Sequence, residues 1–211
     1  MFDIEYKGGN TVVISTKKST AVFDPKLSLV GLKDVVIKDA IEIATEARFA
    51  LDSPVAKLHI EGPGEYEVGD FSIRATAATR HIDTSDTEPL STMYRVEIGD
   101  VRIAVIGNIA GKLSEGQLES LGIIDLLILP VGGGGYTLDA TSAAAVARQI
   151  GPKVVVPVHY ADSALAYEVP QDTLEVFTKE LAAPIETVAK YKVKSIASIP
   201  QTLTVIEVTR S

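Results

Sequence analysis

Cysteine is absent from this sequence, and that absence removes several classes of protein from consideration. Without cysteine there is no disulfide framework, no thiolate nucleophile and no cysteine-ligated zinc. Basic charge is also scarce, since 20 Lys and Arg stand against 28 Asp and Glu, a formal net charge of -8. Nucleic-acid phosphates bind positive surfaces, so we expect no nucleic-acid partner.

Long hydrophobic runs are missing as well. The longest apolar stretch, residues 122–131, is interrupted by Asp125 and is far shorter than the roughly 20 residues that cross a bilayer. The N-terminus carries charges where a signal peptide has its apolar core. We therefore expect a cytoplasmic protein with no membrane partner. The 211 residues show no repeat or linker, so one domain is expected over residues 1–211.

The first half of the sequence is rich in short β-branched runs bounded by Gly, Pro, Lys or Asp, which predict strands. Residues 40–51 contain good helix formers without Gly or Pro and predict a helix. Gly99 and Asp100 predict a tight hairpin turn. The predicted strands are residues 11–14, 20–23, 34–37, 65–68, 71–77, 92–98 and 101–106.

The second half alternates helices with buried strands. Ser114 and Gln117 have the capping-box spacing, which predicts a helix over residues 114–121. Residues 125–131 and 153–158 are apolar runs suited to strands buried on both faces. Between them, residues 139–150 predict a helix with Asp139 as its N-cap, so the two strands should be parallel neighbours. A further helix is predicted at residues 170–181 and a closing strand at residues 203–208.

Five phrases of the sequence, in this order along the chain, resemble the metallo-β-lactamase fold superfamily. They are Phe23-Asp-Pro25, GPGEYEV at residues 62–68, VIGN at residues 105–108, LPVGGGGYTLDA at residues 129–140 and PKVVVPVHY at residues 152–160. More narrowly, the chain is similar to the branch of zinc hydrolases related to L-ascorbate-6-phosphate lactonase. The resemblance implies an α/β fold of the αββα sandwich type, with two mixed β-sheets face to face and helices on the outer faces. It also implies a homo-oligomer, because members of the branch are often oligomeric.

The same resemblance implies a zinc site made from a His-x-His-x-Asp-His motif, a later His, a bridging Asp and a last His. Such ligands hold metal ions that lower the pKa of bound water and supply hydroxide. His81 and His159 stand where the family has ligands, but the bridging position holds Asn108. If the motif follows the strand predicted at residues 34–37, its four positions hold Asp39, Ile41, Ile43 and Ala44.

Two hypotheses follow from this loss of ligands. Catalytic zinc generally requires three protein ligands, so the first is a degenerate member of the family with no resident metal and no conventional hydrolase activity. It would bind a small molecule or act through assembly, and its remnant pocket would comprise His81, Asn108, His159, Asp39 and Asp83. The sequence singles out no catalytic residue.

The alternative is a metal-dependent hydrolase of the phosphoester or lactone type with a rearranged site. Zinc or another divalent metal would then bind His81, Asn108 and His159. Carboxylates can also ligate divalent metals, so a nearby acidic side chain could complete the coordination shell. The candidates are Asp39, Glu42, Glu46 and Asp83. Structural roles compete with both hypotheses. Asn108 suits a turn, and Asp39 with Glu42 suits the cap and solvated face of a helix.

Overall fold

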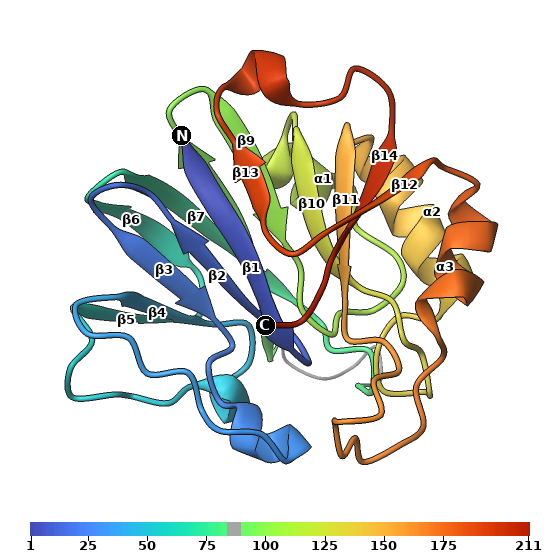
Figure 1. Cartoon of the computed structure of the whole chain (residues 1–211), viewed down its shortest axis with the longest axis horizontal. Coiled ribbons are helices and arrows are strands. Elements are labelled where there is room, and N and C mark those ends of the chain that lie inside the picture. The colour runs from blue at the N-terminus through green and yellow to red at the C-terminus, as the bar shows by residue number, and fades with distance from the viewer. Residues whose placement is uncertain (84–89) are drawn as a thin grey trace.

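The chain forms two β-sheets that pack face to face, with α-helices along one side (Figure 1). The computed structural model describes residues 1–83 and 90–211. In spatial order, the first sheet contains β13 (Tyr191–Val193), β1 (Phe2–Gly8), β2 (Thr11–Ser15), β3 (Thr20–Phe23), β4 (Ile41–Ala44) and β5 (Leu58–Glu61). The second contains β12 (Ile185–Val188), β14 (Thr204–Val208), β11 (Val154–Val158), β10 (Leu126–Pro130), β9 (Val101–Val105), β8 (Ser91–Ile98), β7 (Phe71–Ala78) and β6 (Gly64–Val68).

Both sheets combine parallel and antiparallel pairs, which confirms the predicted sandwich of mixed sheets. In the first sheet β2 pairs antiparallel with β3, whereas β4 runs parallel to β3. In the second, β8 and β9 are antiparallel and β10 and β11 are parallel. The hairpin predicted at Gly99 and Asp100 joins β8 to β9.

The space between the sheets holds the main core. Along β1, Phe2, Ile4 and Tyr6 are buried while the residues between them are only half-buried, the period of two typical of a strand. From the facing sheet, the buried Tyr94 packs edge-on against Phe23 and donates a hydrogen bond to the carbonyl of Ala44 at 2.6 Å. A phenol buried among apolar side chains thus keeps its hydroxyl satisfied.

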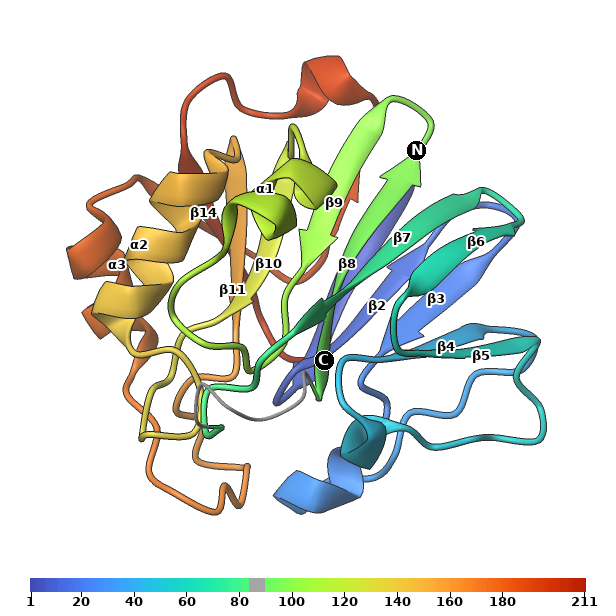
Figure 2. The same ribbon diagram turned by 180° about the vertical axis from the view of Figure 1, so that it is seen from behind.

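The α-helices in the described part of the chain lie on the outer face of the second sheet (Figure 2). They are α1 (Glu115–Leu121), α2 (Ala140–Ile150) and α3 (Leu174–Leu181). The predicted capping box of Ser114 and Gln117 is confirmed, as is the N-cap Asp139, whose Oδ1 accepts from the Ser142 amide at 2.7 Å. None of the described helices is long and apolar enough to cross a membrane.

The helix predicted over residues 40–51 is wrong. These residues form β4 followed by the short 3-10 helix η2 (Ala47–Phe49), and all four residues of β4 are buried between β3 and β5. Ile41 and Ile43 repeat with a period of two and enter the core between the sheets, so the sheet environment outweighs the helix-forming composition.

The strand predicted at residues 34–37 is also wrong. This segment is irregular and lies over the outer face of the first sheet, where Val35 and Ile37 pack on Val13 and Val22. Its β-branched residues therefore cover a sheet instead of extending one. The remaining short helices are η1 (Leu27–Val30) and η3 (Ile196–Ser198), and the helix predicted from residue 170 begins only at Leu174.

Candidate binding site

Loops from both sheets meet where several strands end. Thr45 and Glu46 follow β4, Asn108 comes three residues after β9, and His159 follows β11. Asn10 lies in the turn between β1 and β2, and the Gly9 carbonyl before it accepts a hydrogen bond from the His159 amide at 2.8 Å. The edge formed by the carboxyl ends of strands is a common place for ligand pockets in α/β proteins.

Four buried polar side chains are joined here by hydrogen bonds that all run in one direction. His159 Nδ1 donates to Asn10 Oδ1 at 2.9 Å, Asn10 Nδ2 donates to Asn108 Oδ1 at 3.3 Å, and Asn108 Nδ2 donates to Glu46 Oε1 at 3.4 Å. Because the amide nitrogen of Asn10 is used toward Asn108, its oxygen faces the histidine and the ring hydrogen sits on Nδ1. We call these four side chains the cleft chain.

The carboxylate of Glu46 ends the cleft chain between two arginines. Arg48 Nε lies 3.3 Å from Glu46 Oε2, and Arg80 Nη1 lies 3.8 Å from the same oxygen. Burial raises the pKa of Glu46, and the nearby Arg48, Arg80 and Asn108 oppose that rise. Arg80 also binds both carboxylate oxygens of Asp83, at 2.7 and 2.9 Å, which lowers the pKa of Asp83.

His159 ends the cleft chain at its other side. Its ring lies between those of Tyr136 and Tyr167, with centroids 6.3 and 4.8 Å away. Burial, and then the charge of Arg48, lower the pKa of His159 to about 3, so the ring is neutral near pH 7. A base this weak is unsuited to general base catalysis there, but Nε2, which is buried and has no hydrogen-bond partner among the described residues, can accept a hydrogen bond.

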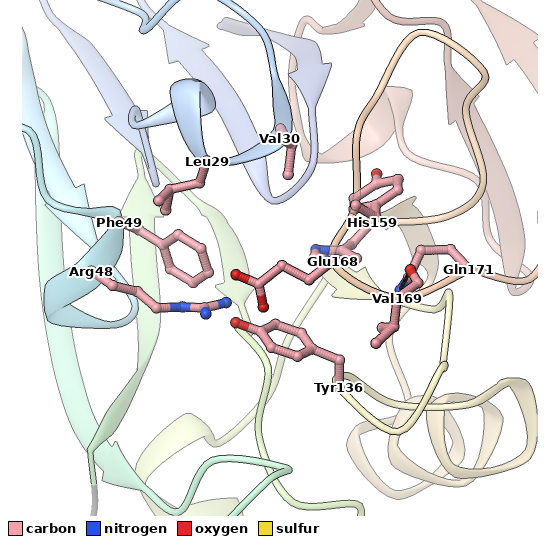
Figure 3. A pocket seen from close by; sticks show the side chains of 10 residues that line it. Leu29, Val30, Arg48, Phe49, Tyr136, His159, Glu168, Val169 and Gln171 are labelled. Carbon is pink, nitrogen blue, oxygen red and sulfur yellow. Dashed lines mark hydrogen bonds between the residues drawn. The ribbon is translucent and has the colours of Figure 1, made fainter.

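A pocket opens beside His159 and contains about 380 Å³ of unfilled space, part of it continuous with solvent. In Figure 3 the guanidinium of Arg48, the carboxylate of Glu168 and the hydroxyl of Tyr136 point toward one another. The Arg48 guanidinium carbon lies 4.5 Å from the ring centroids of both Phe49 and Tyr136, which is cation–π distance. Leu29, Val30, Phe49 and Val169 supply apolar walls.

Of the residues that the sequence analysis singled out, the structure gathers Asn108 and His159 in the cleft chain and places His81 beside it. The His81 amide donates to the Asn108 carbonyl at 2.8 Å, and its ring Nδ1 is buried without a hydrogen-bond partner among the described residues. Asp83 reaches the group only through Arg80.

Asp39 does not join this group. It precedes β4 in a left-handed turn with φ of 58°, whereas the cleft lies after the carboxyl end of that strand. The strand predicted at residues 34–37 is really at residues 41–44, so the first polar positions after it are Thr45 and Glu46. Glu42 points elsewhere and is 3.0 Å from His59.

Sequence reasoning did not find Asn10, Arg48 or Glu168. Arg48 could have been found from the period of two in residues 41–44, which marks a strand and makes the polar residues after it candidates for the cleft. Asn10 follows two left-handed glycines in a tight turn, and Glu168 lies in the long loop between β11 and α3. Neither position carries a sequence signal of its own.

The side chains of the cleft do not fit a dinuclear zinc centre. Among the described residues, no three His, Asp or Glu side chains are grouped so that they could hold a metal ion. The one carboxylate of the cleft chain, Glu46, already lies beside two guanidiniums, and the amide of Asn108 is occupied at both ends. Arg48 balances the charge of Glu46 and Asp83 that of Arg80, so a divalent cation placed there would meet no net negative charge.

Comparison with known proteins agrees with the fold. The family model of the beta-lactamase superfamily domain matches residues 3–159. A candidate Zn-dependent hydrolase of the metallo-β-lactamase superfamily from Thermotoga maritima aligns with a TM-score of 0.78 and 21% identity, covering 99% of this chain and 100% of that one. The metallo hydrolase Igni18 from Ignicoccus hospitalis aligns with a TM-score of 0.64 and 19% identity, over 92% and 99% of the two chains.

A candidate metal-dependent hydrolase from Parabacteroides distasonis gives a TM-score of 0.64 at 16% identity, over 99% of this chain and 94% of that one. At such identities the three structures show a shared fold. Their names refer to metal-dependent hydrolysis; in this chain the buried carboxylate of Glu46 lies beside two arginines.

Proposed function

This chain belongs to the beta-lactamase superfamily domain family, and we propose that it binds a small molecule in its cleft without a metal and is not a zinc-dependent hydrolase. The proposal is supported by the cleft chain of Glu46, Asn108, Asn10 and His159, whose polar groups bind one another. The family neighbours, by their names, make a divalent metal the obvious alternative.

The single observation that carries the proposal is the pairing of Glu46 with Arg48 and Arg80. Two unit charges 4 Å apart interact by about 4 kcal/mol at an effective dielectric constant of about 20, so a divalent ion near one guanidinium is repelled by about 8 kcal/mol. The carboxylate of Glu46 attracts the ion as strongly as Arg48 repels it, and Asp83 already balances the charge of Arg80, so these four side chains offer a divalent ion no net attraction. Zinc would gain from Glu46 only if Arg48 moved away.

The alternative, a hydrolase with a rearranged metal site, draws on two unpartnered ring nitrogens. His81 Nδ1 and His159 Nε2 are both buried and lack a hydrogen-bond partner among the described residues. Two imidazoles are one ligand short of the three that catalytic zinc generally requires. A third donor would have to come from Glu46 after its arginines had moved away.

Elemental mass spectrometry on untagged protein, purified without chelator and then dialysed against zinc, tests the proposal. We expect less than about a tenth of a zinc ion per chain, because fewer than three suitable ligands converge. One or two zinc ions per chain, lost in the double variant His81→Asn/His159→Asn, would overturn the proposal and favour the rearranged hydrolase. A screen of phosphoesters and lactones with Zn²⁺, Mn²⁺ and Mg²⁺ should accordingly show no turnover.

Two further expectations accompany this function. The resemblance implies a homo-oligomer, and the sequence favours the cytoplasm. Light scattering coupled to gel filtration measures the first, and fractionation of cells that express the full chain measures the second.

A further inference from the structure

The polar side chains of the pocket beside His159 form two sets, one of hydrogen-bond donors and one of hydrogen-bond acceptors. Arg48 and the hydroxyl of Tyr136 offer donors, and that hydroxyl has no hydrogen-bond partner among the described residues. His159 Nε2 and the carboxylate of Glu168 offer acceptors. The Tyr136 hydroxyl and His159 Nε2 are buried without a partner, which costs free energy, whereas Glu168 is exposed and Arg48 is half-buried. A ligand that pairs with the two buried groups would remove that cost.

The two sets lie close to each other. In Figure 3 the side chains of Arg48, Tyr136 and Glu168 converge from different segments of the chain, and His159 lies behind Glu168. Because the hydrogen of the imidazole sits on Nδ1 and is given to Asn10, Nε2 is fixed as an acceptor. His159 is 4% exposed and lines the pocket with its Nε2 buried.

We propose that this pocket binds a small zwitterion, whose carboxylate is held by Arg48 and Tyr136 and whose ammonium group is held by Glu168 and His159. The guanidinium fork of arginine matches a carboxylate in geometry and charge. An ammonium group has three donors and can serve the Glu168 carboxylate and the His159 nitrogen together. The inference rests on the proposed function, because it uses a cleft without metal.

The walls add a preference for an apolar body. Leu29, Val30, Phe49 and Val169 also line the pocket, and burial of apolar surface favours binding. Only about 30 Å³ of the pocket is a cavity and the rest is open to solvent, so the pocket takes the charged groups of a compact ligand while part of the ligand stays in solvent. A free α-amino acid with an aliphatic side chain has all these features.

Isothermal titration calorimetry tests the proposal with four compounds. L-Leucine and 6-aminohexanoate are zwitterions with one and five carbons between their charges, 4-methylpentanoate lacks the amine of leucine, and isopentylamine lacks its carboxylate. At concentrations to about 10 mM, which detect millimolar dissociation constants, we expect at least one zwitterion to saturate the protein. Either half-molecule should bind at least about tenfold more weakly than leucine, as expected for loss of a charged hydrogen bond.

Variants of the pocket test which side chain binds the ammonium group of the ligand and which binds its carboxylate. Glu168→Gln should weaken a zwitterion about tenfold or more and leave 4-methylpentanoate unchanged, whereas Arg48→Gln should weaken both. Arg74→Gln and Glu119→Gln change the same residue types at exposed positions that do not line the pocket, and they should behave as wild type. Thermal melting of each variant checks that it is folded.

The outcomes separate the two proposals. If neither zwitterion binds, or if either half-molecule binds as tightly as the better zwitterion, the zwitterion proposal is wrong. The metal content of the same protein batch is measured independently, so zinc in the cleft would refute the metal-free function whatever the titration shows. Zwitterion binding to zinc-free protein, lost in Glu168→Gln, supports both.

Discussion

A buried aspartate next to the cleft should make the stability of this protein depend on pH in an unusual direction. Asp24 follows β3 with a left-handed backbone, is 3% exposed, and accepts hydrogen bonds from the amide and the hydroxyl of Thr45, both at 2.7 Å. Burial raises the pKa of Asp24 from 3.8 to about 7, although the Thr45 bonds and Arg48 lower it; the charge of Glu46 adds to the rise.

The sign follows from proton linkage. Since the folded-state pKa lies above the unfolded one, the folded protein binds the proton more tightly, and this contribution is present at low pH and disappears as the pH rises through 7. With pKa values of about 7 and 3.8, the contribution of Asp24 falls by about 2.5 kcal/mol between pH 5 and pH 8. Most buried salt-bridged carboxylates give the opposite trend.

The variant Asp24→Asn tests this reasoning because asparagine keeps the shape, accepts from the Thr45 amide and donates to its hydroxyl. The free energy of unfolding is measured by urea denaturation at pH 5 and pH 8 for both proteins. Relative to wild type, the variant should gain about 2.5 kcal/mol on going from pH 5 to pH 8. A stability difference that is the same at both pH values would refute the raised pKa.

Three substitutions test a close packing contact and a helix cap, and urea denaturation measures the free energy of unfolding of each variant. A Cβ on Gly107 would lie 2.5 Å from the hydroxyl of Thr45, so Gly107→Ala should lower the free energy of unfolding by about 1–3 kcal/mol, and an unchanged value would contradict the close approach. Gly116→Ala, in α1 with open space around it, is its matched control and should add about 0.5–1 kcal/mol. Ser114→Ala removes the capping box and should cost about 1 kcal/mol; no loss would mean that the cap contributes nothing.

The parts of the fold with unambiguous local signals could be predicted from the sequence. Ser114 and Asp139 mark helix starts through hydrogen bonds within one turn, and the continuous apolar runs that became β10 and β11 fit only strands covered on both faces. Residues 40–51 misled because their composition suits a helix while their position between β3 and β5 is set by pairing with distant residues. Local propensity differs between helix and strand by too little to oppose such pairing.

The candidate site was harder to predict, and one error explains most of the difference. Placing the strand at residues 34–37 put Asp39 in the cleft, whereas the true strand puts Glu46 and Arg48 there. The resemblance singled out Asn108 and His159, and the strands before them, β9 and β11, were correctly predicted. Finding Glu168 requires the path of the loop before α3, which is set by contacts such as the Ala166 amide to the Val30 carbonyl.

The way the loop after β4 is held explains how a cleft of this family can keep its shape without a metal. Thr45 is bound at its amide and hydroxyl by Asp24, and its side chain lies so near Gly107 that only glycine fits there. These contacts bring Glu46 and Asn108, the residues that follow Thr45 and Gly107, within hydrogen-bond distance. These anchoring contacts are hydrogen bonds and close packing within the protein, and through them the backbone presents a carboxylate and an amide to the cleft. The arginines can then neutralise the carboxylate in the place of a cation.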